Sequence, residues 1–167
     1  MRILVAGVGN IFLQDDGFGS AVAQYLRTQA LPEDTTVIDF GTGSIHLAFE
    51  LQNGYDGVLI LDTVSRGGIP GTLYVIEPEL PIQAAPGIPD PHGAHPGWAL
   101  QVLATLPQRP QYVRIIGCEP ASLAEELGLT PTVAAAVPLA ASLVLEQIAA
   151  WTHDATKKGG DVCSGDS

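Results

Sequence analysis

Short apolar runs recur along the chain and alternate with segments in which apolar residues return every three or four positions. Runs of strand length that are almost wholly apolar are typical of strands buried on both faces of a sheet. They predict strands over Arg2–Ala6, Thr36–Asp39, Gly57–Leu61, Thr72–Ile76 and Tyr112–Gly117. The helical spacing between them predicts helices over Gly17–Gln29, Ser44–Leu51 and Trp98–Leu106.

A further helix is predicted from Pro131 to about Trp151. Thr130 is a good N-cap residue, and proline is favoured at the first helical position. Pro138 falls inside this segment and is expected to kink the helix or split it in two. The apolar periodicity ends after Trp151, which predicts a flexible C-terminal tail over residues 152–167.

The alternation of strands and helices predicts an α/β fold. We expect a single three-layer domain over residues 1–151, with a mostly parallel twisted sheet of about five strands flanked by helices. A chain of 167 residues is long enough for one hydrophobic core. Hydrophobic residues make up 46% of the chain and aromatic residues only 6%, so aliphatic side chains must fill that core.

Charge narrows the range of partners. Seven Lys and Arg residues stand against eighteen Asp and Glu residues, for a formal net charge of −11. A surface this acidic repels phosphate backbones and anionic lipids, which argues against nucleic acid and membrane binding. The N-terminus lacks the features of a signal peptide, and no apolar stretch approaches the ~20 residues that span a bilayer. Two cysteines far apart, Cys118 and Cys163, favour a reducing cytoplasm over a disulfide framework.

Polar residues that can bind metal follow the carboxyl ends of the predicted strands, where open parallel sheets bind ligands. Asp15 and Asp16 come after the first strand, Asp62 ends the third, and His92 and His95 precede a predicted helix. One aspartate of the adjacent pair could instead cap a helix, Asp62 could be a turn residue, and a loop histidine is more often inert. Two carboxylates and an imidazole would form an open three-ligand site for a divalent ion used in hydrolysis. The residues alone therefore indicate a metal-assisted hydrolase.

Two other kinds of site compete with this one as explanations of the sequence. Gly7 and Gly9 follow a strand like half of a dinucleotide fingerprint, with Asp39 as a possible ribose ligand, but Phe12 stands where the third glycine belongs. A tight turn explains both glycines more simply. A nucleophilic hydrolase is disfavoured, because no GxSxG motif occurs and neither cysteine has a nearby basic partner in sequence.

Taken together, the motifs resemble the hydrogenase maturation protease family. They are GVGN with DDGFG near the N-terminus, the strand-terminal Asp62, DPHGAHPGWAL, and GCEPASLAEELGLTPTVAAAVP. The resemblance covers about residues 1–150 and is greatest to the branch that serves cytosolic, cofactor-reducing nickel-iron hydrogenases. The pairing of the first motif with GCEPA makes it specific.

The resemblance implies a ligand set that also carries catalysis: Asp16, Asp62 and His92. The pattern HGxxPxxxL of the branch favours His92, whereas an ungapped match to other members would favour His95. The segment Asp39-x-Gly41-Thr42 is similar to the family's second-strand turn, which is linked to substrate recognition. Phe40 stands there in place of the glycine of other branches.

The function implied is that of a cytoplasmic endopeptidase that removes the C-terminal extension of a nickel-iron hydrogenase large-subunit precursor. Nickel would be carried by the substrate, held by its cysteines and sensed by the protease, and no organic cofactor is expected. A metal-polarised carbonyl and a carboxylate base at Asp16 could each activate the water. The alternatives are a nucleotide-binding α/β domain that uses the turn at Gly7 and Gly9, and a non-catalytic escort of a metalloprotein.

Overall fold

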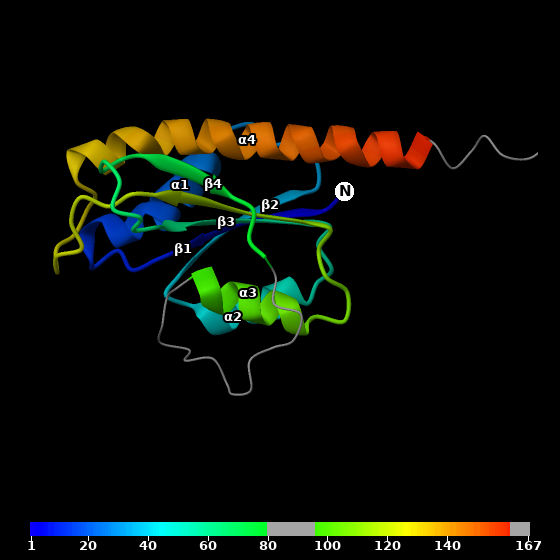
Figure 1. The fold of residues 1–167 in the computed structure, drawn as a ribbon, viewed down its shortest axis with the longest axis horizontal. Coiled ribbons are helices and arrows are strands. Elements are labelled where there is room, and N and C mark those ends of the chain that lie inside the picture. The colour runs from blue at the N-terminus through cyan, green and yellow to red at the C-terminus, as the bar shows by residue number, and fades with distance from the viewer. Residues whose placement is uncertain (80–95, 161–167) are drawn as a thin grey trace, which may run out of the picture.

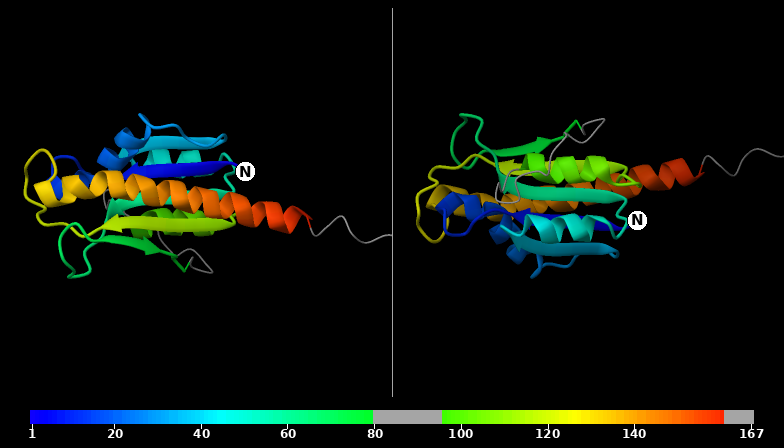
Figure 2. Two further views of the ribbon diagram at one scale, coloured as in Figure 1. Left: turned by 90° about the horizontal axis from the view of Figure 1, so that it is seen from above. Right: turned by 90° about the horizontal axis from the view of Figure 1, so that it is seen from below.

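The protein folds as three layers, with a sheet between two pairs of helices (Figures 1 and 2). This computed structural model describes residues 1–79 and 96–160. The strands are β1 Ile3–Val8, β2 Thr35–Gly41, β3 Gly57–Thr63, β4 Leu73–Ile76 and β5 Tyr112–Cys118. The helices are the 3-10 turn η1 Gln14–Gly17, then α1 Phe18–Leu26, α2 Ser44–Leu51, α3 Pro96–Thr105 and α4 Pro131–Gly160.

The sheet is mostly parallel, as the sequence predicted. Its five strands lie in the order β2-β1-β3-β5-β4, and β4 alone among them runs antiparallel to its neighbour. The carboxyl ends of β1, β2, β3 and β5 therefore meet at one end of the sheet, which we call the carboxyl edge. Asp16, which follows β1, and Asp62, near the end of β3, lie at this edge, whereas His92 falls outside the described residues.

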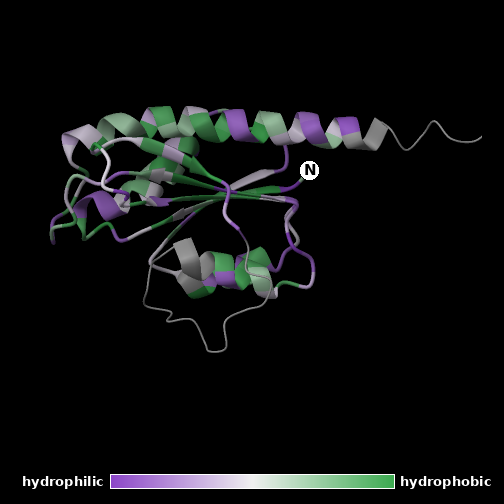
Figure 3. Cartoon of the chain, in the orientation of Figure 1, coloured by the Kyte–Doolittle hydropathy of each residue, from purple (hydrophilic) through white to green (hydrophobic). Residues whose placement is uncertain are grey.

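Each face of the sheet has its own hydrophobic cluster. Alternate residues of a strand point to opposite faces, so Ile3 and Val5 pack toward α1 and α4, whereas Leu4 and Ala6 pack toward α2 and α3. The central strands β1 and β3 are buried on both faces, which explains why they appear in the sequence as unbroken apolar runs. Figure 3 shows this as hydrophobic colour along the strands.

Helix α4 differs in two ways from the helix predicted by the sequence. It passes Pro138 as one helix, so the predicted split is wrong. Pro138 and Ala134, whose carbonyl loses its usual partner, both lie on the exposed side of the helix, where water can take that bond. The helix also continues to Gly160, so residues 152–160 are helical, although a flexible tail was expected from residue 152; residues 161–167 lie outside the described residues.

The apolar character of α4 has a structural reason. By length and composition this helix could cross a bilayer, because an 18-residue window within Pro131–Lys157 has a mean hydropathy of 1.8, contrary to the expectation from the sequence that no such stretch exists. The helix instead lies along the whole sheet (Figure 1) and buries one side against α1 and β5. The buried residues recur at helical spacing and are Val133, Ala136, Val137, Ala140, Ala141, Val144, Ile148 and Trp151. This pattern is that of a helix that packs one side against the rest of the fold.

Candidate functional site

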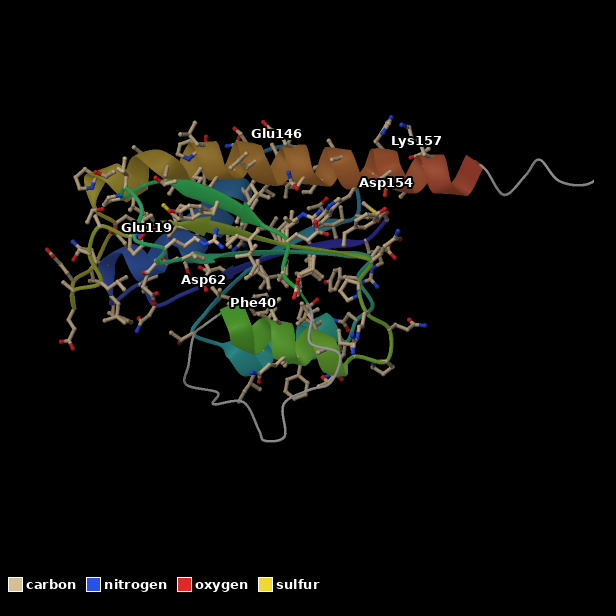
Figure 4. All side chains as sticks on the ribbon, viewed as in Figure 1. Phe40, Asp62, Glu119, Glu146, Asp154 and Lys157 are labelled. Carbon is tan, nitrogen blue, oxygen red and sulfur yellow. The ribbon has the colours of Figure 1, made fainter. Side chains whose placement is uncertain are left out.

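Asp62 is the most unusual polar residue at the carboxyl edge. It lies near the end of β3 opposite Gly117, and its residue is only 1% exposed (Figure 4). Its Oδ1 accepts a hydrogen bond of 2.7 Å from the amide of Thr63, whereas its buried Oδ2 has no partner among residues 1–79 and 96–160. Burial raises the pKa of this carboxyl well above its ordinary value; the Thr63 amide opposes that shift, and the negative charge of Asp16 adds to it.

Asp16 is the second carboxylate at this site. It lies in η1, is half-buried, and its Oδ2 accepts a hydrogen bond of 2.8 Å from the amide of Asn10. Because its charge acts on Asp62, the fold brings these two predicted site residues together. His92 and the alternative ligand His95 lie outside the described residues. Within the described part of the chain, no group of three His, Cys, Asp or Glu side chains forms a ready metal site.

Asp15, the neighbour of Asp16, has a structural role. Its side chain is fully buried, and its carboxylate accepts hydrogen bonds from the amides of Ala121, Ser122 and Thr130 and from the Thr130 hydroxyl, at 2.7 to 3.0 Å. Its own carbonyl accepts a bond of 2.7 Å from the Thr63 hydroxyl. Asp15 therefore ties η1 to the loop after β5 and to the end of β3, which fixes Asp16 beside Asp62.

Glu119, from the GCEPA motif, holds the loop that follows Asp62. Its carboxylate accepts hydrogen bonds from the amides of Arg66 and Gly67 and from the hydroxyl of Tyr74, at 2.9 to 3.1 Å. The Arg66 amide is the main cause of a lowered pKa for Glu119. Reasoning from single residues missed the roles of Asp15 and Glu119. The GCEPA motif was the one signal in the sequence that pointed to this region.

The glycines near β1 serve close packing. Gly9 has a φ of +131°, which favours glycine, and a side chain there would collide with the carbonyl of Asp16. A side chain at Gly19 would collide with the carbonyls of Val8 and Leu61. The turn and helix α1 thus approach the strands as closely as the backbone permits, and this packing accounts for the glycines without a nucleotide.

Asp39, the possible ribose ligand, is already held within the protein. Its Oδ1 accepts hydrogen bonds from the Ser20 hydroxyl at 2.7 Å and the Gly41 amide at 3.1 Å, and its Oδ2 accepts one from Gln24 at 3.1 Å. These bonds fix the turn after β2 to α1. They leave the nucleotide alternative without its acidic ligand.

Cys118 is poorly suited to act as a nucleophile. It ends β5, is 1% exposed, and burial together with the charges of Asp15 and Glu119 raises the pKa of its thiol to about 11. A reactive cysteine needs the thiolate form near neutral pH. Carboxylates, not a thiol, are therefore the reactive groups that the described part of this edge offers.

Sequence comparison with known proteins identifies several relatives that are connected with hydrogenases. The family model for hydrogenase maturation protease matches residues 20–147. The chain is 33% identical to coenzyme F420 hydrogenase subunit delta of Methanothermobacter thermautotrophicus over 88% of this chain and 94% of that protein. It is 34% identical to the hydrogenase 2 maturation protease of Escherichia coli over 87% of this chain and 89% of that protein.

Solved structures agree with the sequence relatives. The hydrogenase maturating endopeptidase HybD from Escherichia coli superposes with a TM-score of 0.74 at 31% identity, over 89% of this chain and 92% of that one. The hydrogenase 2 maturation peptidase from a Thaumarchaeota archaeon gives a TM-score of 0.68 at 33% identity, over 89% of this chain and 99% of that one. On the evidence of the family model, the relatives and the shared fold, this chain belongs to the hydrogenase maturation protease family and is a peptide hydrolase.

Proposed function

We propose that this chain removes the C-terminal extension of a nickel-iron hydrogenase large-subunit precursor after nickel has been inserted. In this proposal the nickel arrives with the substrate and is recognised by Asp16, Asp62 and His92. One observation carries it: Asp62 keeps a buried carboxylate oxygen with no partner in the described structure, beside a second carboxylate. An unpaired buried carboxylate is costly for folding, and a cation would relieve that cost.

The two carboxylates and the imidazole proposed as ligands suit a site that contacts the nickel of the substrate but does not remove it. Two carboxylates and an imidazole are harder ligands than thiolates, so they hold nickel less tightly than the cysteines of the substrate. The protease would thus read the presence of nickel and release it with the product. A nickel-free precursor would bring no cation to the two carboxylates, and their mutual repulsion would disfavour a productive complex.

The same carboxylates fit the chemistry of peptide hydrolysis. Water adds to the scissile carbonyl carbon and gives up a proton, the C–N bond breaks, and the new amine takes a proton as it leaves. Asp16 is half-buried and therefore accessible to water, which suits it to accept the proton. The nickel of the substrate would polarise the scissile carbonyl, so that water could attack it directly and no nucleophilic side chain would be needed.

The relative named coenzyme F420 hydrogenase subunit delta favours a cofactor-reducing hydrogenase as the source of the precursor. We place the reaction in the cytoplasm and expect no organic cofactor, nucleic acid or membrane as a partner. The net charge of −11 supports the last two expectations, because phosphates and anionic lipids are repelled. The partner is then a protein that presents a metal cluster and a flexible tail.

Three variants test the ligand set: Asp16→Asn, Asp62→Asn and His92→Ala, assayed on nickel-loaded precursor by intact mass. Each is expected to reduce cleavage at least a hundredfold while the protein stays folded. Glu146→Gln and His153→Ala, two exposed positions on α4, serve as matched controls and should cleave normally. Full activity of Asp62→Asn would contradict the proposal. Tight binding of NAD, or precursor binding without cleavage by the wild-type protein, would favour the nucleotide or the escort alternative.

A further inference from the structure

Large apolar side chains are exposed at the carboxyl edge. Those that follow strand ends are Ile11 and Phe12 after β1, Ile45 after β2, Ile69 after β3, and Leu123 and Leu127 after β5. Phe12 is 64% exposed and Leu127 is 68% exposed. Contiguous exposed apolar surface is typical of sites that bind a partner, so the question is whether any of these side chains lie together.

Two of these loops form a groove beside the candidate site. It is lined by Asn10, Phe12, Leu13, Glu125, Glu126 and Leu127. The loops are joined by backbone bonds from Gln14 to the carbonyl of Glu126, at 2.8 Å, and from Asp15 to the carbonyl of Ser122, at 3.2 Å. The Gln14 side chain also donates to the Glu126 carboxylate at 3.1 Å. These bonds hold the groove in shape before any partner arrives.

The charge on the groove selects the kind of partner. Glu125 and Glu126 are both exposed, and no lysine or arginine lies in its lining. An occupant must offer an apolar side chain to Phe12 and Leu127 and a positive charge to the two glutamates. An acidic occupant would be repelled by the two glutamates. The same repulsion disfavours a second copy of this chain as the occupant, because the chain has a net charge of −11.

The groove is connected directly to the candidate site. Asn10 lines it, and the Asn10 amide donates the 2.8 Å hydrogen bond to Asp16. A peptide seated in the groove would therefore pass next to a carboxylate that we assign to nickel recognition. The backbone at Asn10, which contacts both the groove and Asp16, would thus fix the position of the peptide relative to the carboxylate.

We propose that this groove binds the segment of the hydrogenase precursor next to the scissile bond, through an apolar side chain between Phe12 and Leu127 and a lysine or arginine at Glu125 and Glu126. The inference rests on the proposed function and deepens it. The groove then determines which precursor is accepted, while the carboxylates detect its nickel.

The apolar half of the proposal is tested with the double variant Phe12→Ser, Leu127→Ser on nickel-loaded precursor. We expect KM to rise at least tenfold and kcat to change less than twofold, because the groove contributes binding and not chemistry. The matched control is Phe49→Ser, Leu139→Ser, which removes two apolar side chains of similar exposure, 66% and 63%, from α2 and α4. Thermal melting confirms that both variants are folded.

The charged half is tested independently with Glu125→Lys, compared with Glu146→Lys on the exposed side of α4. Glu125→Lys should raise KM at least tenfold in low salt and less in high salt, whereas Glu146→Lys should change it less than twofold. Replacing each basic residue of the precursor near the cut by glutamate, one at a time, should yield one precursor that restores cleavage by Glu125→Lys.

The outcomes separate this inference from the proposed function. If the wild-type protein does not cleave loaded precursor, the proposed function fails. If it does, and the groove variants keep the wild-type KM or change no more than their controls, the groove proposal is overturned. A changed oligomeric state of the groove variants in light scattering, with KM unaltered, would show that a second copy covers this surface instead.

Discussion

The carboxylate of Asp62 illustrates how a single residue can oppose folding and, in the proposed function, take part in substrate recognition. It is buried, one of its oxygens has no partner in the described structure, and its pKa is raised by burial. We predict that Asp62→Asn abolishes cleavage and yet increases the free energy of unfolding at pH 7, by roughly 0.5–2 kcal/mol, which is the usual size of a single stabilising substitution. Urea unfolding of the two proteins measures this difference.

The pH dependence of that difference follows from the direction of the shift. A raised folded pKa means that ionisation of Asp62 disfavours the folded state. Its contribution to stability is therefore greatest below its ordinary pKa of 3.8 and declines as pH rises toward the folded pKa. The advantage of Asp62→Asn should accordingly grow from about pH 4 toward neutrality. A variant less stable than wild type at pH 7, or an advantage independent of pH, would contradict this account.

Asp15 is expected to behave in the opposite way to Asp62. Its carboxylate satisfies three backbone amides and one hydroxyl. We predict that Asp15→Ala lowers the free energy of unfolding by about 3 kcal/mol or more, since hydrogen bonds to a charged group contribute roughly 1.5–3 kcal/mol each. Calorimetry of Asp15→Ala and Asp16→Ala would check it. Equal losses of stability in the two variants would refute the division of roles between these neighbours.

The contrast between neighbouring residues marks what the sequence could reveal at this scale. Asp62 and the pair Asp15 and Asp16 became candidates because acidic residues after buried strands are unexpected, and only the family resemblance favoured Asp16 over Asp15. The role of Asp15 depends on partners 106 to 115 positions away along the chain, and no local pattern reports them. The same holds for Glu119, whose partners include Arg66 at a separation of 53 residues.

At the scale of elements, helix α1 depends on glycine for its contact with the sheet. A side chain at Gly19 would meet the carbonyls of Val8 and Leu61, which belong to two strands. We predict that Gly19→Ala lowers the free energy of unfolding by about 2 kcal/mol or more, because overpacking of a rigid backbone contact is destabilising. The melting temperature should fall accordingly.

A second glycine provides the control for this prediction. Gly54 has a φ of +73° and open space around its Cβ position. Asparagine tolerates that backbone conformation, so Gly54→Asn should change stability far less than Gly19→Ala. If both substitutions cost the same, backbone freedom in general, and not the close approach of α1, would explain the glycines.

Helix α4 shows why element ends are harder to predict than beginnings. Thr130 and Pro131 predict where it begins. The structure agrees, because the amide of Ala134 donates a hydrogen bond of 2.8 Å to the Thr130 carbonyl. Its final turns are polar, and no sequence periodicity supports them. The structure supports them with tertiary contacts, since Tyr112 stacks on Trp151 with ring centroids 5.4 Å apart and donates a hydrogen bond to Asp154.

At the scale of the whole molecule, the alternation of strands and helices was sufficient to predict three layers and a mostly parallel sheet. It did not reveal the strand order or the antiparallel β4, because pairing between distant strands leaves no local signature. The parallel arrangement of the other strands is nevertheless what gathers Asp16, Asp62 and the groove at one edge. Fold and site are thus linked by topology.

The central claim is that nickel belongs to the substrate, and it is tested most directly by one cleavage assay. The enzyme is first treated with a chelator, which is then removed. It is mixed with nickel-loaded or nickel-free hydrogenase large-subunit precursor, and the products are identified by intact-mass spectrometry. We predict full processing of the loaded precursor and none of the nickel-free one, because carboxylate and imidazole ligands cannot compete with cysteines for this ion. Cleavage of nickel-free precursor, or loss of activity that added zinc restores, would contradict the account.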